Sequence, residues 1–66
     1  MNITINGNPQ TINEQQTVLE LLKSFKLNPD TTAVEKNGVI LQKGSYASET
    51  ISDNDIFELI RFMGGG

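Results

Sequence analysis

The sequence predicts an α+β fold, a single domain in which one helix packs across a mixed sheet of four or five strands. Three observations support this class. Residues 1–6 alternate between apolar and polar side chains, as a half-buried strand does. Residues 17–29 place apolar side chains at helical spacing behind a helix-start signal. The last hydrophobic segment, residues 56–63, has the apolar composition of a strand inside a sheet.

The first two strands are expected to form a hairpin. Met1, Ile3 and Ile5 share one face of the first strand. Asn6-Gly7 then predicts a tight turn, because both residue types tolerate positive φ. A weaker strand follows over residues 10–13. Pro9 at its start indicates an edge position, since proline has no N–H to donate to a neighbouring strand.

A helix is expected to begin at Thr17. Thr17 and Glu20 have capping-box spacing, in which the hydroxyl and the carboxylate each satisfy an orphan main-chain N–H. Lys23 and Lys26 suit the negative pole of the helix dipole, and Leu27-Asn28-Pro29 is expected to close the helix. Four apolar residues form a single stripe that we expect to be buried: Val18, Leu21, Leu22 and Phe25.

A second hairpin is expected after the helix. Its arms are residues 31–36 and 39–42, joined by Asn37-Gly38. Residues 43–50 then form a polar loop, in which Tyr46 is expected to rest on the core with its hydroxyl toward water. Ile51 is a second expected anchor, and Asp53-Asn54-Asp55 is an expected turn.

The closing strand, residues 56–63, is expected to lie in the middle of the sheet. Phe57 and Leu59 fall on one of its faces, while Ile60 and Phe62 fall on the other. A strand that is apolar on both faces is usually central. It can pair with the first strand in parallel, because the helix supplies the crossover that parallel pairing requires.

Composition narrows the classes of function. The 66 residues include no cysteine and no histidine, so the chain has neither a thiolate nucleophile nor the commonest general base and metal ligand. A net charge of −3 argues against a nucleic-acid-binding surface. No apolar run approaches the length of a membrane span, and the first residues lack a signal-peptide pattern. We expect a soluble cytoplasmic protein whose chemistry comes from partners or from the chain terminus.

Four acidic side chains in the second half of the chain are not expected to bind a metal. Ca²⁺ and Mg²⁺ need several oxygen ligands that converge within about 2.0–2.6 Å, and this cluster lacks the glycine-punctuated loop of a dedicated calcium site. These side chains are expected instead to attract a basic partner, an effect that salt would weaken. They are Glu49, Asp53, Asp55 and Glu58.

The candidate functional site is the glycine tail. Residues 1–63 are expected to form the folded domain, and Gly64, Gly65 and Gly66 a flexible arm. Because glycine has no Cβ, such an arm fits a narrow active-site channel. Its only reactive group is the α-carboxylate of Gly66, which is ionised near neutral pH and can attack an activated phosphorus. The alternative interpretation is a frayed end or an expression remnant.

Several segments together match the pattern of one known family. They are Asn6-Gly7, Thr17-Val18-Leu19-Glu20-Leu21-Leu22, residues 33–41, Ile51, Asp53-Asn54-Asp55, Phe57-Glu58-Leu59 and Gly64-Gly65-Gly66. With these segments in this order, the chain resembles the sulfur carrier proteins of thiamine (thiazole) biosynthesis, the ThiS family, over essentially its whole length. The resemblance implies the β-grasp, or ubiquitin-like, fold.

The chain departs from the family pattern at a few positions. Gln42 stands where proline is common, Tyr46 where tryptophan is frequent, and Asn54 where glycine is common. These are scaffold positions, so we expect them to affect stability more than function. Phe62-Met63 is bulkier than the usual pair before the glycines. We expect this bulk to affect the fit to a partner's channel, and hence which partner the chain binds.

The resemblance implies a sulfur carrier and not an enzyme. In the family, an E1-like adenylyltransferase uses ATP and Mg²⁺ to activate the terminal carboxylate, here that of Gly66. Sulfur from a cysteine desulfurase system then yields a thiocarboxylate, and a thiazole synthase takes up the sulfur. Gly65 and Gly64 would lie in the partners' active sites, and Met63 and Phe62 are candidate docking residues. No cofactor is expected on the chain itself.

Other interpretations stay open at the level of sequence. The small subunit of molybdopterin synthase resembles the chain in fold and in its Gly-Gly end, although the short length and residues 33–37 favour the thiazole carrier. In a different class, the chain is a ubiquitin-like binding module with an idle tail. A stand-alone enzyme is least expected, for want of a nucleophile, a base and a pocket.

Overall fold

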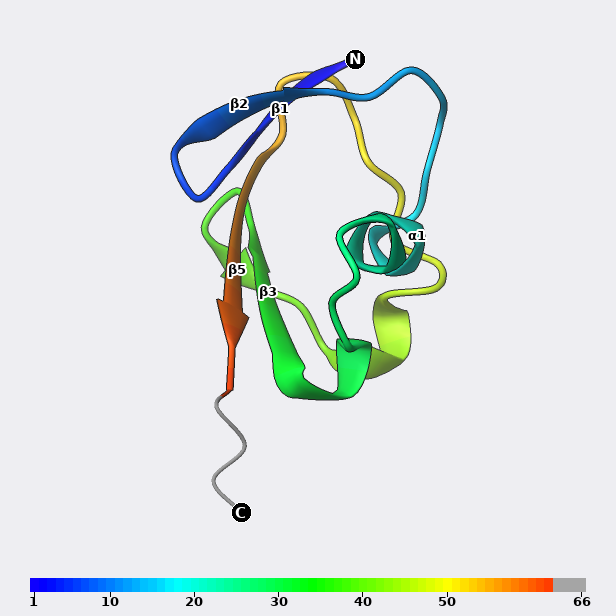
Figure 1. Ribbon diagram of the computed structural model, residues 1–66, viewed down its shortest axis with the longest axis vertical. Helices are drawn as coiled ribbons and strands as arrows, with labels where there is room; N and C mark the ends of the chain where they lie inside the picture. The colour runs from blue at the N-terminus through cyan, green and yellow to red at the C-terminus, as the bar shows by residue number, and fades with distance from the viewer. Residues whose placement is uncertain (63–66) are drawn as a thin grey trace.

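The computed structural model describes residues 1–62, which form a five-stranded sheet with one α-helix on one face (Figure 1). The strand order is β2-β1-β5-β3-β4. The predicted α+β fold is confirmed. The elements are β1 (Asn2–Ile5), β2 (Asn8–Thr11), α1 (Val18–Ser24), a 3₁₀ turn (Pro29–Thr31), β3 (Thr32–Lys36), β4 (Val39–Ile40), a second 3₁₀ turn (Lys43–Ser45) and β5 (Ile56–Arg61).

β5 lies in the middle of the sheet, as predicted. It pairs in parallel with β1 through Ile56 and Phe57, and antiparallel with β3 along its length. The expected reason is wrong, however, because only the face toward α1 is covered. Phe57 and Leu59 are buried on that face, whereas Ile60 on the other is 56% exposed. A single short helix covers one face of the sheet and leaves the outer face open.

The first hairpin forms as predicted, but its second strand begins two residues earlier than expected. Asn6 and Gly7 make the whole turn, with φ angles of 50° and 83°, so pairing resumes at Asn8. Pro9 therefore lies inside β2, opposite Thr4, and not before the strand. β2 is an edge strand, as Pro9 indicated.

The helix α1 begins where the capping box predicts. The Glu20 main-chain N–H donates to the Thr17 hydroxyl at 3.2 Å, and the Thr17 N–H donates to the Glu20 carboxylate at 2.9 Å. Two donors that the helix cannot satisfy are therefore paired by side chains. Val18, Leu21 and Leu22 are buried, which confirms three members of the predicted stripe.

The helix ends at Ser24, before the predicted closing segment. Lys26 adopts a left-handed conformation with φ 59°, and Leu27 donates its N–H to the Leu22 carbonyl at 2.9 Å. This is a Schellman-type ending, in which the reversed residue turns the chain away from the helix axis. Phe25, the fourth expected member of the buried stripe, is consequently 41% exposed.

The second hairpin forms around Asn37-Gly38, with φ angles of 51° and 85°. β4 is only two residues long, shorter than expected. The two 3₁₀ turns were not predicted, because segments of three residues are too short to show a periodic pattern.

Tyr46 is buried more deeply than the sequence suggests. Its side chain is 2% exposed, and its hydroxyl donates a hydrogen bond to the Thr32 carbonyl at 2.9 Å, so the expectation that the hydroxyl meets water is wrong. Burial raises the pKa of this hydroxyl. Ile51 is fully buried, and the turn at Asp53-Asn54 forms, both as predicted.

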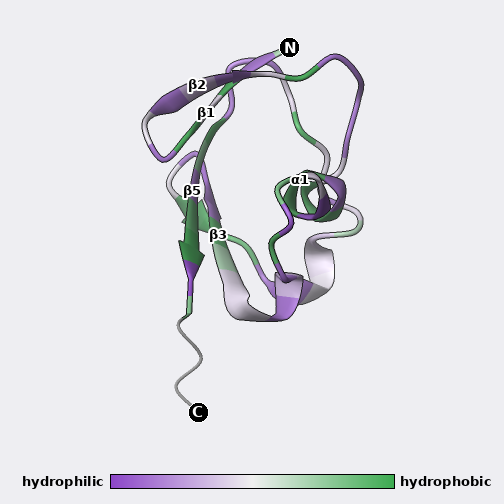
Figure 2. Ribbon diagram, in the orientation of Figure 1, coloured by the Kyte–Doolittle hydropathy of each residue, from purple (hydrophilic) through white to green (hydrophobic). Residues whose placement is uncertain are grey.

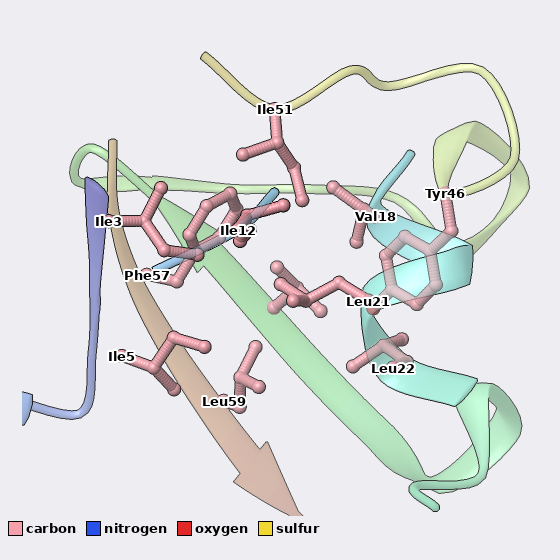
Figure 3. Close-up of a cluster of buried hydrophobic side chains, with 11 residues drawn as sticks. Ile3, Ile5, Ile12, Val18, Leu21, Leu22, Tyr46, Ile51, Phe57 and Leu59 are labelled. Atoms are coloured by element: carbon pink, nitrogen blue, oxygen red, sulfur yellow. The ribbon is translucent and has the colours of Figure 1, made fainter. Parts of the chain in front are cut away.

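The core lies between α1 and the inner face of the sheet (Figure 3). Figure 2 shows β5 as a largely hydrophobic strand and β2 as a hydrophilic one. Among the described residues, no helix is long and apolar enough to cross a membrane. The core residues are Ile3, Ile5, Ile12, Val18, Leu21, Leu22, Val34, Tyr46, Ile51, Phe57 and Leu59.

Candidate functional site

The predicted site lies at the end of the chain, and the structure describes the strand that leads to it. Gly64, Gly65, Gly66 and Met63 lie outside the described residues. Phe62 is the last described residue, and its side chain is 55% exposed. The described part of the site is therefore the strand β5 as far as Phe62, together with the contacts that hold this strand in the sheet.

On one side, β3 holds β5 to its end. The register runs from Lys36↔Phe57 to Thr32↔Arg61, and Phe62 continues it by donating its N–H to the Thr31 carbonyl at 2.8 Å. Antiparallel pairing of this kind fixes the last described residue to the middle of the sheet.

On the other side, the side chain of Asn6 takes the place of a strand. β1 pairs with only the first two residues of β5 and then turns away at Asn6. The Asn6 main-chain N–H donates to the Phe57 carbonyl at 2.9 Å. Its side-chain Oδ1 accepts the Leu59 N–H at 2.8 Å, and its Nδ2 donates to the Leu59 carbonyl at 3.2 Å. One amide thus satisfies both main-chain groups of Leu59.

Asn37 holds the start of β5 from the opposite flank. Its main-chain N–H donates to the Ile56 carbonyl at 2.7 Å, and its Oδ1 accepts the Ile56 N–H at 2.8 Å. Its Nδ2 donates to Asp55 at 2.9 Å. Both Asn-Gly turns therefore clamp β5, a role that sequence reasoning missed. The only sequence signal for this role is the asparagine in each Asn-Gly pair. Its preference for turns already explains its presence there, so nothing in the sequence points to a second role.

Lys36 ties the polar loop to the sheet. Its Nζ lies 2.8 Å from Glu49 and 3.7 Å from Asp55, and it donates to the Thr50 carbonyl at 2.9 Å. The hydrogen bond to Glu49 raises the pKa of Lys36, with help from the charge of Asp55 and against the effect of burial. The side chain is mostly buried, so this network is structural.

The four acidic residues considered for a metal site have separate contacts. Glu49 and Asp55 bind Lys36, and Asp53 accepts the Asn2 N–H at 2.7 Å. Glu58 lies on the outer face of β5. Within residues 1–62, no three acidic side chains are placed to share a metal ion.

The outer face of the sheet carries exposed apolar side chains around two carboxylates. Ile60 lies opposite Ala33, and Glu58 lies opposite Glu35, which is also paired with Ile40. Like charges placed directly across two strands repel each other. Both ion pairs within the described chain belong to Lys36, so neither Glu35 nor Glu58 forms an ion pair there. We call the exposed apolar residues of this face, Ile40, Ile56, Ile60 and Phe62, the outer-face patch.

The comparison with known proteins identifies relatives along the whole chain. The model described as the ThiS family matches residues 3–66. The sulfur carrier protein ThiS of Bacillus subtilis is 36% identical over 50 residues, which are 76% of each chain. The crystal structure of the thiamine biosynthesis protein ThiS from Geobacter metallireducens matches all of both chains, with a TM-score of 0.85 and 39% identity. This likeness confirms the β-grasp fold.

Longer proteins also contain a similar segment. The thiazole synthase of Magnetococcus marinus is 32% identical to the chain over 66 residues, and that of Paramagnetospirillum magneticum is 36% identical over the same length. The chain spans 20% of the length of each of these two relatives.

Proposed function

The chain belongs to the ThiS family, and on that premise we propose that it is a sulfur carrier protein of thiamine biosynthesis, in which Gly66 bears the sulfur. The observation that carries the proposal is the family match, which extends through residue 66 and so includes the glycine tail. The chain acts as a carrier and co-substrate and not as a catalyst. It has no cysteine or histidine, and its sulfur would be held on the acyl carbon of the last residue.

Activation would occur in the active site of a partner adenylyltransferase. A carboxylate oxygen of Gly66 attacks the α-phosphorus of ATP, the bond between the α- and β-phosphates breaks, and pyrophosphate leaves. Mg²⁺ and cationic groups of the partner offset the repulsion between the two anions. The chain's own contribution is a tail without side chains, Gly64-Gly65-Gly66, that can enter a narrow channel.

Sulfur transfer would follow on the activated carbonyl. A thiol first reduces the persulfide sulfur of a cysteine desulfurase to hydrosulfide and is itself oxidised to a disulfide. The hydrosulfide then attacks the acyl carbon, AMP leaves, and a thiocarboxylate remains on Gly66. A thiazole synthase then takes up the sulfur and returns the carboxylate. The similarity of the whole chain to a segment of two thiazole synthases supports this partner, because fused segments often derive from proteins that act together.

The outer-face patch is the proposed docking surface for these partners. It includes Phe62, the described residue nearest the tail, and Ile60, which is 56% exposed although it is apolar. Glu35 and Glu58 in its middle favour a partner that places a basic side chain between them. Attraction of this kind weakens as salt rises, so the association rate should fall with ionic strength.

The test measures pyrophosphate release with ATP, Mg²⁺ and the adenylyltransferase from the same cells. Removal of Gly65-Gly66 should abolish release, and Gly65→Ala should slow it because a methyl group crowds the channel. Gly44→Ala is the matched control, since a methyl group there meets nothing within 4 Å. Near-normal release from the shortened chain would contradict the proposal. Partner binding that survives the deletion without any release would favour a non-covalent binding module.

A further inference from the structure

We propose that the thiazole synthase that receives the tail adds a strand to β5 along its β1 flank, beginning at the main chain of Arg61. This strand addition rests on the proposed function, because the enzyme is one that takes the carrier's tail. The occupant of the flank is an extended segment of that enzyme, held by main-chain hydrogen bonds.

Main-chain groups along a paired strand point alternately to its two neighbours. Phe62 donates to Thr31, on the β3 side. Leu59 has both of its main-chain groups bonded to the side chain of Asn6, on the β1 side. Arg61 follows Leu59 by two residues, so its N–H and C=O also point to the β1 side.

The contacts of β3 agree with this alternation. Thr32 lies opposite Arg61, and its carbonyl accepts the Tyr46 hydroxyl. The Val34 carbonyl accepts the Leu41 N–H at 2.9 Å, on the β4 side. Both carbonyls therefore point away from β5. By this alternation Thr32 and Arg61 form a non-hydrogen-bonded pair of the ladder. On the β1 side, the strand pairing within residues 1–62 reaches only Phe57 and gives Arg61 no partner.

The β1 flank of β5 is open beyond Leu59. β1 accompanies β5 only at Ile56 and Phe57, after which Asn6-Gly7 carries the chain back into β2. Figure 1 shows the lower half of β5 with β3 on one side and no strand on the other. A central strand thus becomes an edge strand just before the tail, and exposed edges accept further strands.

Asn6 fixes where the added strand can begin. Its amide already occupies the N–H and C=O of Leu59, so the next free pair along this flank belongs to Arg61. Gly66 is the fifth residue after Arg61, a span that an extended chain covers in about 17 Å. An enzyme strand paired at Arg61 therefore sets the greatest depth to which the Gly66 carboxylate can reach.

The other free strand edges suit this role less well. β2 contains Pro9, which has no N–H, and β4 has only two residues. Both lie at the ends of the strand order, whereas the tail continues from β5. Gly64-Gly65-Gly66 has no side chains, so main-chain hydrogen bonds are the directional contacts that this segment can offer.

Arg61→Pro tests the strand addition because it removes the N–H at the open flank without touching the β3 pairing. Proline is tolerated where a strand does not use the N–H, and Ile60 before it already has the extended conformation that proline favours. Arg61→Ala is the matched control, since it removes the side chain and keeps the N–H. The affinity of each full chain for purified thiazole synthase of the same organism is measured by calorimetry. We expect Arg61→Pro to bind about tenfold more weakly than Arg61→Ala.

Hydrogen–deuterium exchange of the unaltered chain gives a second measurement that does not depend on how the variant folds. The Arg61 amide should exchange more slowly in the complex, with the Ile60 amide, which faces β3, as the internal reference. Equal affinities of the two variants, or equal exchange at Arg61 in the free and bound chain, would overturn the strand addition.

The intact mass of the unaltered chain separates the two proposals. If Gly66 acquires sulfur but Arg61→Pro and Arg61→Ala bind with equal affinity, the carrier function stands and the strand addition is overturned. A chain that never acquires sulfur would overturn the carrier function, and the strand addition would fall with it.

Discussion

Asn6 shows how a single side chain completes a sheet. Its φ of 50° makes the turn, and its amide pairs with both main-chain groups of Leu59. The sequence predicts the first role, because Asn-Gly has a strong local preference. It does not predict the second, since spacing along the chain does not say which strand lies beside the turn. The clamp depends on a β5 residue that is 53 positions away in the sequence.

Replacing Asn6 by glycine separates these two roles. Glycine accepts the φ of 50° but has no amide, so the free energy of unfolding should fall by about 1–3 kcal/mol. Asn54→Gly is the control, because Asn54 has a φ of 72° and no side-chain hydrogen bond within the described chain. Urea denaturation measures both variants. A loss at Asn6 no larger than that at Asn54 would show that the amide contributes nothing.

The buried hydroxyl of Tyr46 should make the free energy of unfolding fall at alkaline pH. Burial raises its pKa, so the folded chain keeps the hydroxyl proton to higher pH than the unfolded chain does. The contribution of the Tyr46 hydroxyl to stability is therefore fully present below the unfolded-state pKa of about 10. It is lost as the pH rises through the pKa of the folded state. The pKa of Lys36 is also raised, mainly by its hydrogen bond to Glu49. This shift likewise makes the folded chain less stable as the pH rises.

Tyr46→Phe should remove part of this alkaline loss. At neutral pH the variant should lose about 1–3 kcal/mol, because the buried Thr32 carbonyl is left without its donor. Above about pH 10 its unfolding free energy should fall less steeply than that of the unaltered chain. Urea midpoints over a pH series measure the slope. Parallel curves for the two proteins would rule out the tyrosine as a cause.

At the scale of elements, the two ends of α1 show which boundaries a sequence reveals. The start depends on Thr17 and Glu20, whose side chains form a local pattern. The end depends on Lys26 in a left-handed conformation, where glycine or asparagine would give the usual signal. A lysine gives none, so the helix was expected to continue to Leu27. The early start of β2 has a similar cause, because Pro9 looks like a boundary although an edge strand tolerates it.

Lys26→Gly should stabilise the end of the helix. Glycine has no Cβ to strain a φ of 59°, so we expect a gain of about 0.5–1 kcal/mol. Lys23→Gly, inside the helix, should instead cost about 1 kcal/mol. Thermal and urea unfolding compare the two variants. Destabilisation by both glycines to the same extent would contradict the described helix end.

At the scale of the whole molecule, a sheet with one covering helix has two different faces. The sequence predicts that β5 is central and apolar, but it does not reveal that the outer face is uncovered. Ile40 and Ile60 were therefore missed as surface residues, while Phe62 was expected to be available for docking. The tail residues themselves are predicted only by composition and family resemblance, since their role depends on enzymes outside the chain. A cytoplasmic location likewise stays a prediction from the sequence.

An apolar substitution on the outer face should affect partner binding, whereas one on the inner face should affect stability. Ile60→Ser, on the outer-face patch, should change the free energy of unfolding by less than about 1 kcal/mol and weaken binding to the thiazole synthase about tenfold. Phe57→Ala, in the core, should cost about 3–5 kcal/mol. Val39→Ser is the control, because Val39 is 62% exposed but lies outside the patch. If Ile60→Ser and Val39→Ser bind equally well, the patch is not the docking surface.

The most direct test of the carrier function is the intact mass of the untagged chain. The chain is incubated with ATP, Mg²⁺, a cysteine-derived sulfur source and extract of its own cells, and fragmentation locates any change. We predict a gain that corresponds to one oxygen replaced by one sulfur, on Gly66. An unchanged Gly66, in an extract whose activating enzyme modifies a known carrier, would contradict the carrier function.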